Sequence, residues 1–132
     1  MNMDSKKTTR ETQKKKFDKG TYIKEMHTFS ELYAQKTNTF FCLDPSITSV
    51  IIAGLADYKE KYALPLCPCR NFRSERVEIE LNFWICPCVA MRERKECHCK
   101  LFVRPDDSNA SQTQKIPLIT VYHNLIYNLY NL

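Results

Sequence analysis

The 132-residue sequence contains no apolar run that approaches the roughly 20 residues of a membrane-spanning helix. Its first 20 residues lack the apolar segment of a secretory signal, and they are rich in Lys rather than Arg and carry three acids, unlike a transit peptide. There are only two glycines and no long internal repeats. These absences exclude a spanning helix, predict a chain that is not exported, and favour one compact domain.

Most of the excess positive charge lies at the N-terminal end. The net charge is +5, and residues 1–20 hold seven Lys or Arg against three Asp or Glu, so the other residues sum to only +1. We predict that residues 1–20 form a disordered basic tail, because a charged segment with few apolar residues cannot offset its ordering entropy. Residues 67–104 are also locally positive, which fits an acidic protein partner better than nucleic acid.

Apolar side chains recur at the helical period in three stretches, and we expect the main helices there. The predicted ranges are residues 21–36, 45–61 and 117–132. Asp44 is a typical N-cap residue, and Pro45 suits the first position of the second helix. The predicted apolar faces are Tyr22, Met26, Phe29 and Tyr33, then Ile47, Ile51, Leu55, Tyr58 and Tyr62, then Leu118, Tyr122, Leu125, Leu129 and Leu132.

The middle of the sequence is less regular. Residues 74–84 fit a helix capped by Ser74, but their alternating apolar side chains fit a strand as well. Residues 101–104 fit a short strand, and residues 105–115 fit a polar loop. The sequence therefore predicts a mostly α, small helical domain whose cysteines lie in the loops.

The chain has seven cysteines, a high and odd number. Without an export signal, this number favours metal binding or redox chemistry over a disulfide-stapled secreted fold. Six of them form three C-x-C pairs, with 16 residues between the first and second pair and eight between the second and third: Cys67-Pro68-Cys69, Cys86-Pro87-Cys88 and Cys97-His98-Cys99. The seventh, Cys42, is expected to be a buried, inert thiol.

The number of cysteines leaves three kinds of site open. A 4Fe-4S cluster takes four thiolates and would leave one dithiol couple. A structural zinc site also takes four ligands, but zinc ligands are usually spaced C-x₂₋₄-C, and none of these pairs is. The spacing therefore modestly favours iron–sulfur, and a zinc module or an iron–sulfur electron carrier without disulfide chemistry remains an alternative.

Residues 86–99, from Cys86-Pro87-Cys88 to Cys97-His98-Cys99, together with Cys67-Pro68-Cys69-Arg70, resemble the signature of ferredoxin–thioredoxin reductase catalytic (beta) chains. The match in spacing covers all six cysteines, and residues 39–55 resemble the family too. The resemblance runs from about residue 21 to about residue 117. The sequence departs from the family at Ala90, at Lys100 and in the segment from about residue 118.

The resemblance implies an enzyme, a ferredoxin:thioredoxin disulfide reductase, in which residues 21–132 form the catalytic domain and its loops wrap around a 4Fe-4S cluster. The residues that match the cluster ligands are Cys67, Cys86, Cys88 and Cys97. Cys69 and Cys99 match the redox-active disulfide, and His98 matches a histidine that assists proton and electron handling. Cys69 would be the exposed sulfur that attacks thioredoxin, and Cys99 would face the cluster.

A polar stretch follows Cys69, which agrees with an exposed sulfur. An apolar run follows Cys99 and Lys100, which agrees with a buried sulfur at Cys99. Arg70 and His98 are expected to favour the thiolate forms of the neighbouring cysteines.

The resemblance also implies partners: a small β-barrel variable (alpha) subunit in a heterodimer, with ferredoxin and thioredoxin on opposite faces. No nucleic-acid or membrane partner is expected. The family places the chain in the plastid stroma (chloroplast). Frequent Lys, Asn, Ile and Tyr without a transit-like leader predict that the plastid encodes it, and a cyanobacterial-type cytoplasm is the alternative.

Overall fold

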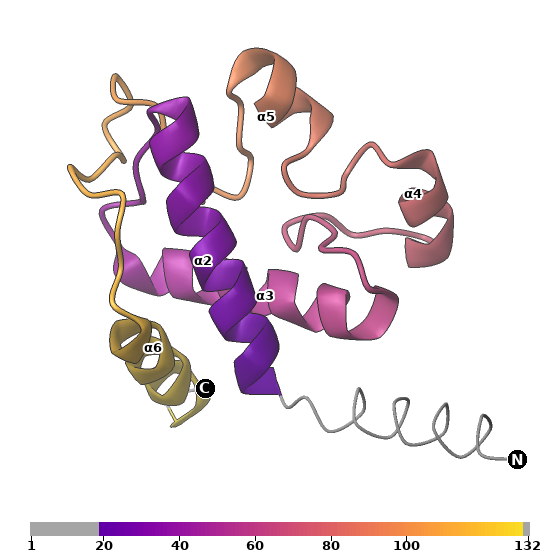
Figure 1. Cartoon of the computed structure of the whole chain (residues 1–132), viewed down its shortest axis with the longest axis horizontal. Coiled ribbons are helices and arrows are strands. Elements are labelled where there is room, and N and C mark those ends of the chain that lie inside the picture. The colour runs from indigo at the N-terminus through magenta and orange to yellow at the C-terminus, as the bar shows by residue number, and fades with distance from the viewer. Residues whose placement is uncertain (1–18, 131–132) are drawn as a thin grey trace, which may run out of the picture.

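The computed structural model describes residues 19–130, and this part of the chain is mostly helical, as predicted (Figure 1). Its five helices are α2 (Lys19–Thr37), α3 (Pro45–Tyr62), α4 (Glu75–Leu81), α5 (Val89–Arg94) and α6 (Leu118–Tyr130). Residues 1–18 of the predicted tail lie outside the described residues, whereas Lys19 and Gly20 already belong to α2. No helix in residues 19–130 is long and apolar enough to cross a membrane.

Helices α2 and α3 pack against each other, and α2 crosses α3 in Figure 1. The buried side of α2 consists of Ile23, Met26, Ser30 and Ala34. Of the predicted stripe, only Met26 is fully buried, while Tyr22, Phe29 and Tyr33 pack against the core from its edge. The stripe therefore identified the correct side of the helix, but the buried positions also include Ile23 and the small residues Ser30 and Ala34.

Helix α3 begins as predicted. The Asp44 carboxylate accepts a hydrogen bond from the backbone N–H of Ser46 at 3.0 Å, and Pro45 follows at the first helical position. The predicted apolar face was partly wrong, because Ile47 is 39% exposed while Thr48 and Ser49 are buried. Asn124 of α6 donates a hydrogen bond to the Ser49 hydroxyl at 3.1 Å, so a polar pair lies within this helix contact.

The ambiguous segment 74–84 forms a short helix, because the Ser74 hydroxyl caps α4 by accepting from the backbone N–H of Val77 at 3.4 Å. None of the side chains of α4 is buried. The segment at 101–104 contributes an isolated antiparallel bridge, Val103 with Phe40, and the following loop contains only turns and one further bridge. The predicted loop at 105–115 is confirmed.

The C-terminal helix α6 packs against α3, as Figure 1 shows. Val121 is fully buried, and Leu118, Tyr122 and Leu125 pack against the core. The helix predicted at 117–132 is thereby confirmed as far as Tyr130. The side chains of Leu129 and Leu132, predicted for the same face, lie outside the described part.

Candidate redox site

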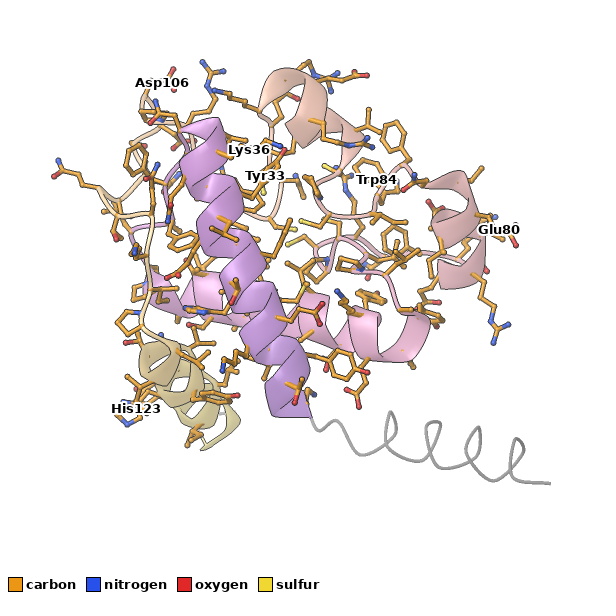
Figure 2. All side chains as sticks on the ribbon, in the orientation of Figure 1. Tyr33, Lys36, Glu80, Trp84, Asp106 and His123 are labelled. Carbon is orange, nitrogen blue, oxygen red and sulfur yellow. The ribbon has the colours of Figure 1, made fainter. Side chains whose placement is uncertain are left out.

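The three C-x-C pairs come together although they lie in three separate loops. The first follows α3, the second lies between α4 and α5, and the third follows α5. Five of the six cysteines line one apolar cavity: Cys67, Cys86, Cys88, Cys97 and Cys99. Figure 2 shows sulfur atoms gathered in the middle of the molecule, between α2 and the loops. Ile51 and Leu55 of α3 and Met91 of α5 supply part of the apolar wall.

Backbone hydrogen bonds hold the first two pairs against each other. The N–H of Cys67 donates to the carbonyl of Trp84, and the N–H of Cys86 donates to the carbonyl of Pro65, both at 2.8 Å. Leu66 and Ile85, between these bonds, form an antiparallel bridge. Two loops that are distant in the sequence are therefore aligned by a short ladder.

The second pair is also held by α5. The Arg92 Nε–H donates to the carbonyl of Pro87 at 3.0 Å, and Met91 on the same helix is only 2% exposed. The peptide bond between Cys86 and Pro87 is cis. Because α5 starts directly after Cys88, the helix fixes the direction in which the chain leaves the pair.

Cys99, from the third pair, lies against the first pair. It is buried, and its Sγ lies 3.0 Å from the Sγ of the equally buried Cys67. The hydrogen bond from Cys99 lowers the pKa of Cys67 to about 6, and Arg70 adds to this effect, although burial opposes it. The same contact, together with burial and the neighbouring Cys69, raises the pKa of Cys99. The lowered pKa favours the thiolate form of Cys67, which is the form that binds metals.

Cys69 is exposed and Cys99 is buried, so the exposures predicted for these two sulfurs are confirmed. Arg70 lowers the pKa of both Cys67 and Cys69, as expected, but at Cys69 this effect is not the largest one. Burial of its sulfur raises the pKa of Cys69 and outweighs the lowering by Cys99 and Arg70. The Arg70 guanidinium instead stacks on the ring of Trp84, with its Cζ 3.8 Å from the ring centroid.

His98 is exposed at the edge of the cavity, between Cys97 and Cys99. It also borders an open groove on the surface that runs toward Arg104. The charged residues of this groove are Arg70, Lys95, Lys100 and Arg104 against Glu96 and Asp107. Lys100 pairs with Asp107 at 3.3 Å, and the remaining charges are mainly positive, as the sequence predicted for this region.

The donor set fits a four-iron cluster. Cys67, Cys86, Cys88 and Cys97 supply four sulfurs from three loops to one apolar cavity, and a 4Fe-4S cluster takes one thiolate on each iron. Burial raises the pKa of Cys86 and of Cys97, so binding of iron would release their protons. Within residues 19–130 no group of three or more His, Cys, Asp or Glu side chains could hold a single metal ion. A 4Fe-4S cluster does not need such a group, because each of its irons takes one thiolate from the protein.

Two residues beside the site were not predicted to belong to it. Tyr33 on α2, labelled in Figure 2, was assigned only to a core face, yet burial and the Cys86 sulfur raise its pKa. Arg92 was predicted as part of a solvated charged face, yet it binds the Pro87 carbonyl. No sequence pattern marks either contact. The seventh cysteine, Cys42, is buried away from the cavity, as expected.

Comparison with known proteins agrees with this arrangement. The sequence profile of the family described as "Ferredoxin thioredoxin reductase catalytic beta chain" matches residues 13–124. The chain belongs to this family. The match extends beyond the residues 21–117 over which the sequence resemblance was predicted, and it includes the first half of α6. The predicted family, and with it an oxidoreductase chain, is confirmed.

Several members of the ferredoxin–thioredoxin reductase family resemble the chain closely. The catalytic chain of Pyropia yezoensis is 52% identical over 99 residues, 75% of this chain and 85% of that protein. The catalytic chain of Synechocystis is 52% identical over 96 residues, 73% of this chain and 81% of that protein. The chloroplastic catalytic chain of Oryza sativa is 55% identical over 93 residues, 70% of this chain and 64% of that protein.

Proposed function

We propose that the chain is the catalytic subunit of a ferredoxin-dependent thioredoxin reductase. In this proposal Cys67, Cys86, Cys88 and Cys97 hold a 4Fe-4S cluster, and Cys69 and Cys99 form the redox-active disulfide. One observation carries the proposal: of six cysteines gathered from three loops, only Cys69 is exposed, and Cys99 lies buried against Cys67. Four sulfurs can then serve metal, and two remain for exchange.

The exposed position of Cys69 supports its role as the attacking sulfur. Its thiolate would attack the disulfide of thioredoxin, so that one S–S bond breaks and a mixed disulfide with Cys69 forms. The thiolate of Cys99 would then attack the Cys69 sulfur, reform the Cys69–Cys99 disulfide and release thioredoxin as a dithiol. The two electrons and two protons gained by thioredoxin come from the two cysteine thiols.

The disulfide must be reduced again before the next cycle. When bound, the cluster would supply electrons one at a time from ferredoxin to this disulfide. Cys99 is the sulfur that would face it, because Cys99 is buried and lies 3.0 Å from the ligand Cys67. The exposure of His98 beside Cys99 supports a role in carrying the proton between the sulfur and water.

The family's names support the proposed partners and location. Relatives are named as catalytic chains, which implies a second subunit, here the variable (alpha) subunit in a heterodimer. Relatives from Oryza sativa and Arabidopsis thaliana are named chloroplastic, and one relative is cyanobacterial. We therefore place the chain in a plastid stroma, with a cyanobacterial cytoplasm as the alternative. The positive groove beside His98 supports acidic protein partners rather than nucleic acid.

The proposal is tested by analysis of protein purified without oxygen. Iron, sulfide and zinc are measured per chain, and free thiols are titrated before and after reduction. The expected result is about four irons and four sulfides, with two thiols gained on reduction. Zinc in place of iron would contradict the cluster. Iron without any gain of thiols would indicate an electron carrier and would contradict the reductase.

A further inference from the structure

Helix α3 has a glycine in its interior, at Gly54. Apart from proline, glycine is the residue least favourable to a helix interior. Its backbone angle does not explain it, since no glycine among the described residues has a positive φ. The position could therefore carry any residue as far as the backbone is concerned, and the reason for glycine must lie in what packs against it.

The neighbour of Gly54 is Pro68, the middle residue of the first C-P-C motif. A Cβ built on Gly54 would lie 2.6 Å from the Pro68 Cβ and 3.1 Å from its Cγ. Carbon atoms in contact are normally about 3.5–4.0 Å apart, so a side chain at position 54 would have to displace Pro68 by about 1 Å. The proline ring is closed onto its own backbone nitrogen and cannot rotate away. The displacement would pass directly to Cys67 and Cys69.

The neighbours of Gly54 on α3 connect this position to the cysteine cavity. Ile51 and Leu55, on the same helix, line the cavity into which Cys67 and Cys99 point, so α3 forms the support beneath the first motif. A disulfide closes only when its Cα atoms are about 4.4–6.8 Å apart and its Cβ vectors are suitably directed. A shift of about 1 Å at Pro68 is a large part of that range.

We propose that Gly54 is a positioning residue for the redox-active pair. Its missing side chain lets α3 lie directly against Pro68, and this contact holds the Cys67-Pro68-Cys69 turn where Cys69 can pair with Cys99. The inference rests on the proposed function, because it takes Cys69 and Cys99 as the exchanging pair. It adds a residue outside the three cysteine motifs that controls how readily the pair closes.

The test is the equilibrium between the Cys69–Cys99 dithiol and glutathione in the cluster-loaded protein, without oxygen. Oxidised glutathione takes up two electrons and two protons as the Cys69–Cys99 bond forms, and two reduced glutathione molecules result. Free thiols are trapped and counted by mass. In Gly54→Ala the equilibrium constant for disulfide formation should fall about tenfold or more, because the pair is moved out of its range. An unchanged constant would overturn the inference.

Helix propensity provides an independent readout. Alanine favours a helix more than glycine does. If Gly54 mattered only to the stability of α3, Gly54→Ala would raise the unfolding midpoint and leave the disulfide equilibrium unchanged. The positioning role predicts a weaker disulfide in protein that keeps its iron and its helix content. If the wild-type chain itself formed no Cys69–Cys99 disulfide, the proposed function would fail. A wild-type disulfide with no effect of Gly54→Ala would remove only the role of Gly54.

A double-mutant cycle assigns the effect to the contact. Pro68→Gly removes both atoms that a side chain at position 54 would meet. On this background Gly54→Ala should change the equilibrium constant by less than about twofold further, because the pair no longer touches. An equal loss on both backgrounds would overturn the inference. If Gly54→Ala did not fold, a folded Gly54→Ala/Pro68→Gly chain would support the contact, and an unfolded one would contradict it.

Discussion

The motifs Cys67-Pro68-Cys69 and Cys86-Pro87-Cys88 have the same three residues but place their sulfurs differently. In the first, Cys67 lines the cavity and Cys69 is exposed. In the second, both sulfurs line the cavity. The two turns also differ in their backbone, because the peptide bond before Pro87 is cis and the one before Pro68 is not.

The segments that follow the two motifs differ as well. After Cys69 the chain continues with Arg70, whose guanidinium stacks on the ring of Trp84, and then with a polar stretch. After Cys88 the chain enters α5 at once, and Met91 anchors that helix in the core. In the proposed site, the pair followed by a polar loop supplies one ligand and one reactive thiol, and the pair followed by an anchored helix supplies two ligands.

The largest expected effect is on the iron content of serine variants, which should differ between the two motifs. Serine at Cys86, Cys88 or Cys67 should remove most of the iron, because a cluster needs four thiolates. Serine at Cys69 should leave the iron in place and abolish thioredoxin reduction. Iron per chain and thioredoxin reduction are measured for each variant, and Cys42→Ser is the control, since this cysteine lies outside the cavity. Full iron in Cys86→Ser or Cys88→Ser would show that the second motif does not supply two ligands.

A smaller effect is expected from the bond that fixes the second motif. Arg92→Met removes the donor to the Pro87 carbonyl and should cost about 0.5–1 kcal/mol, since the side chain is exposed. Iron should then be lost to a chelator up to about fivefold faster, as that energy converts. Arg94→Met is the matched control, because Arg94 pairs with Glu93 and Glu96 at the surface. Equal rates for the two variants would mean that the hydrogen bond does not hold the motif.

A similarly small effect is expected for the residue that follows the first motif. Arg70→Met and Trp84→Leu each remove one partner of the stacked pair, and the two changes should be coupled by about 0.5–1 kcal/mol. The coupling is obtained from denaturant unfolding of the wild type, the two single variants and the double variant. Strictly additive losses would show that the stacking does not contribute to holding the exit from Cys69.

The sequence predicted those parts of the fold that depend on local chemistry. Asp44 with Pro45 marked the start of α3, and the polar stretch after Cys69 indicated its exposure. The same pattern could not resolve the buried face of α3, where Ser49 is covered by α6 through a hydrogen bond to Asn124. A small polar residue carries no apolar signal, so only the packing of a distant helix shows that it is buried.

The group of six cysteines could be predicted because its spacing is distinctive. The packing that holds these cysteines in place could not be predicted from the sequence. Gly54 and Pro68 are 14 positions apart, and their contact arises only when α3 lies beneath the loop. The charge beside Cys69 was also insufficient to predict its pKa, since Arg70 lowers that pKa but burial raises it more. Steric contacts and desolvation depend on the folded arrangement, whereas caps and motif spacing can be read along the chain.

The division of labour between Cys69 and Cys99 is tested most directly by trapping thioredoxin. A thioredoxin that lacks its second active-site cysteine, activated as a disulfide with a chromogenic thiol, is mixed with Cys99→Ser or Cys69→Ser protein. Cys99→Ser should form a covalent mixed disulfide through the exposed Cys69, and Cys69→Ser should form almost none, because the remaining sulfur is buried. Trapping through Cys99 in the Cys69→Ser protein, with none in the Cys99→Ser protein, would contradict the account.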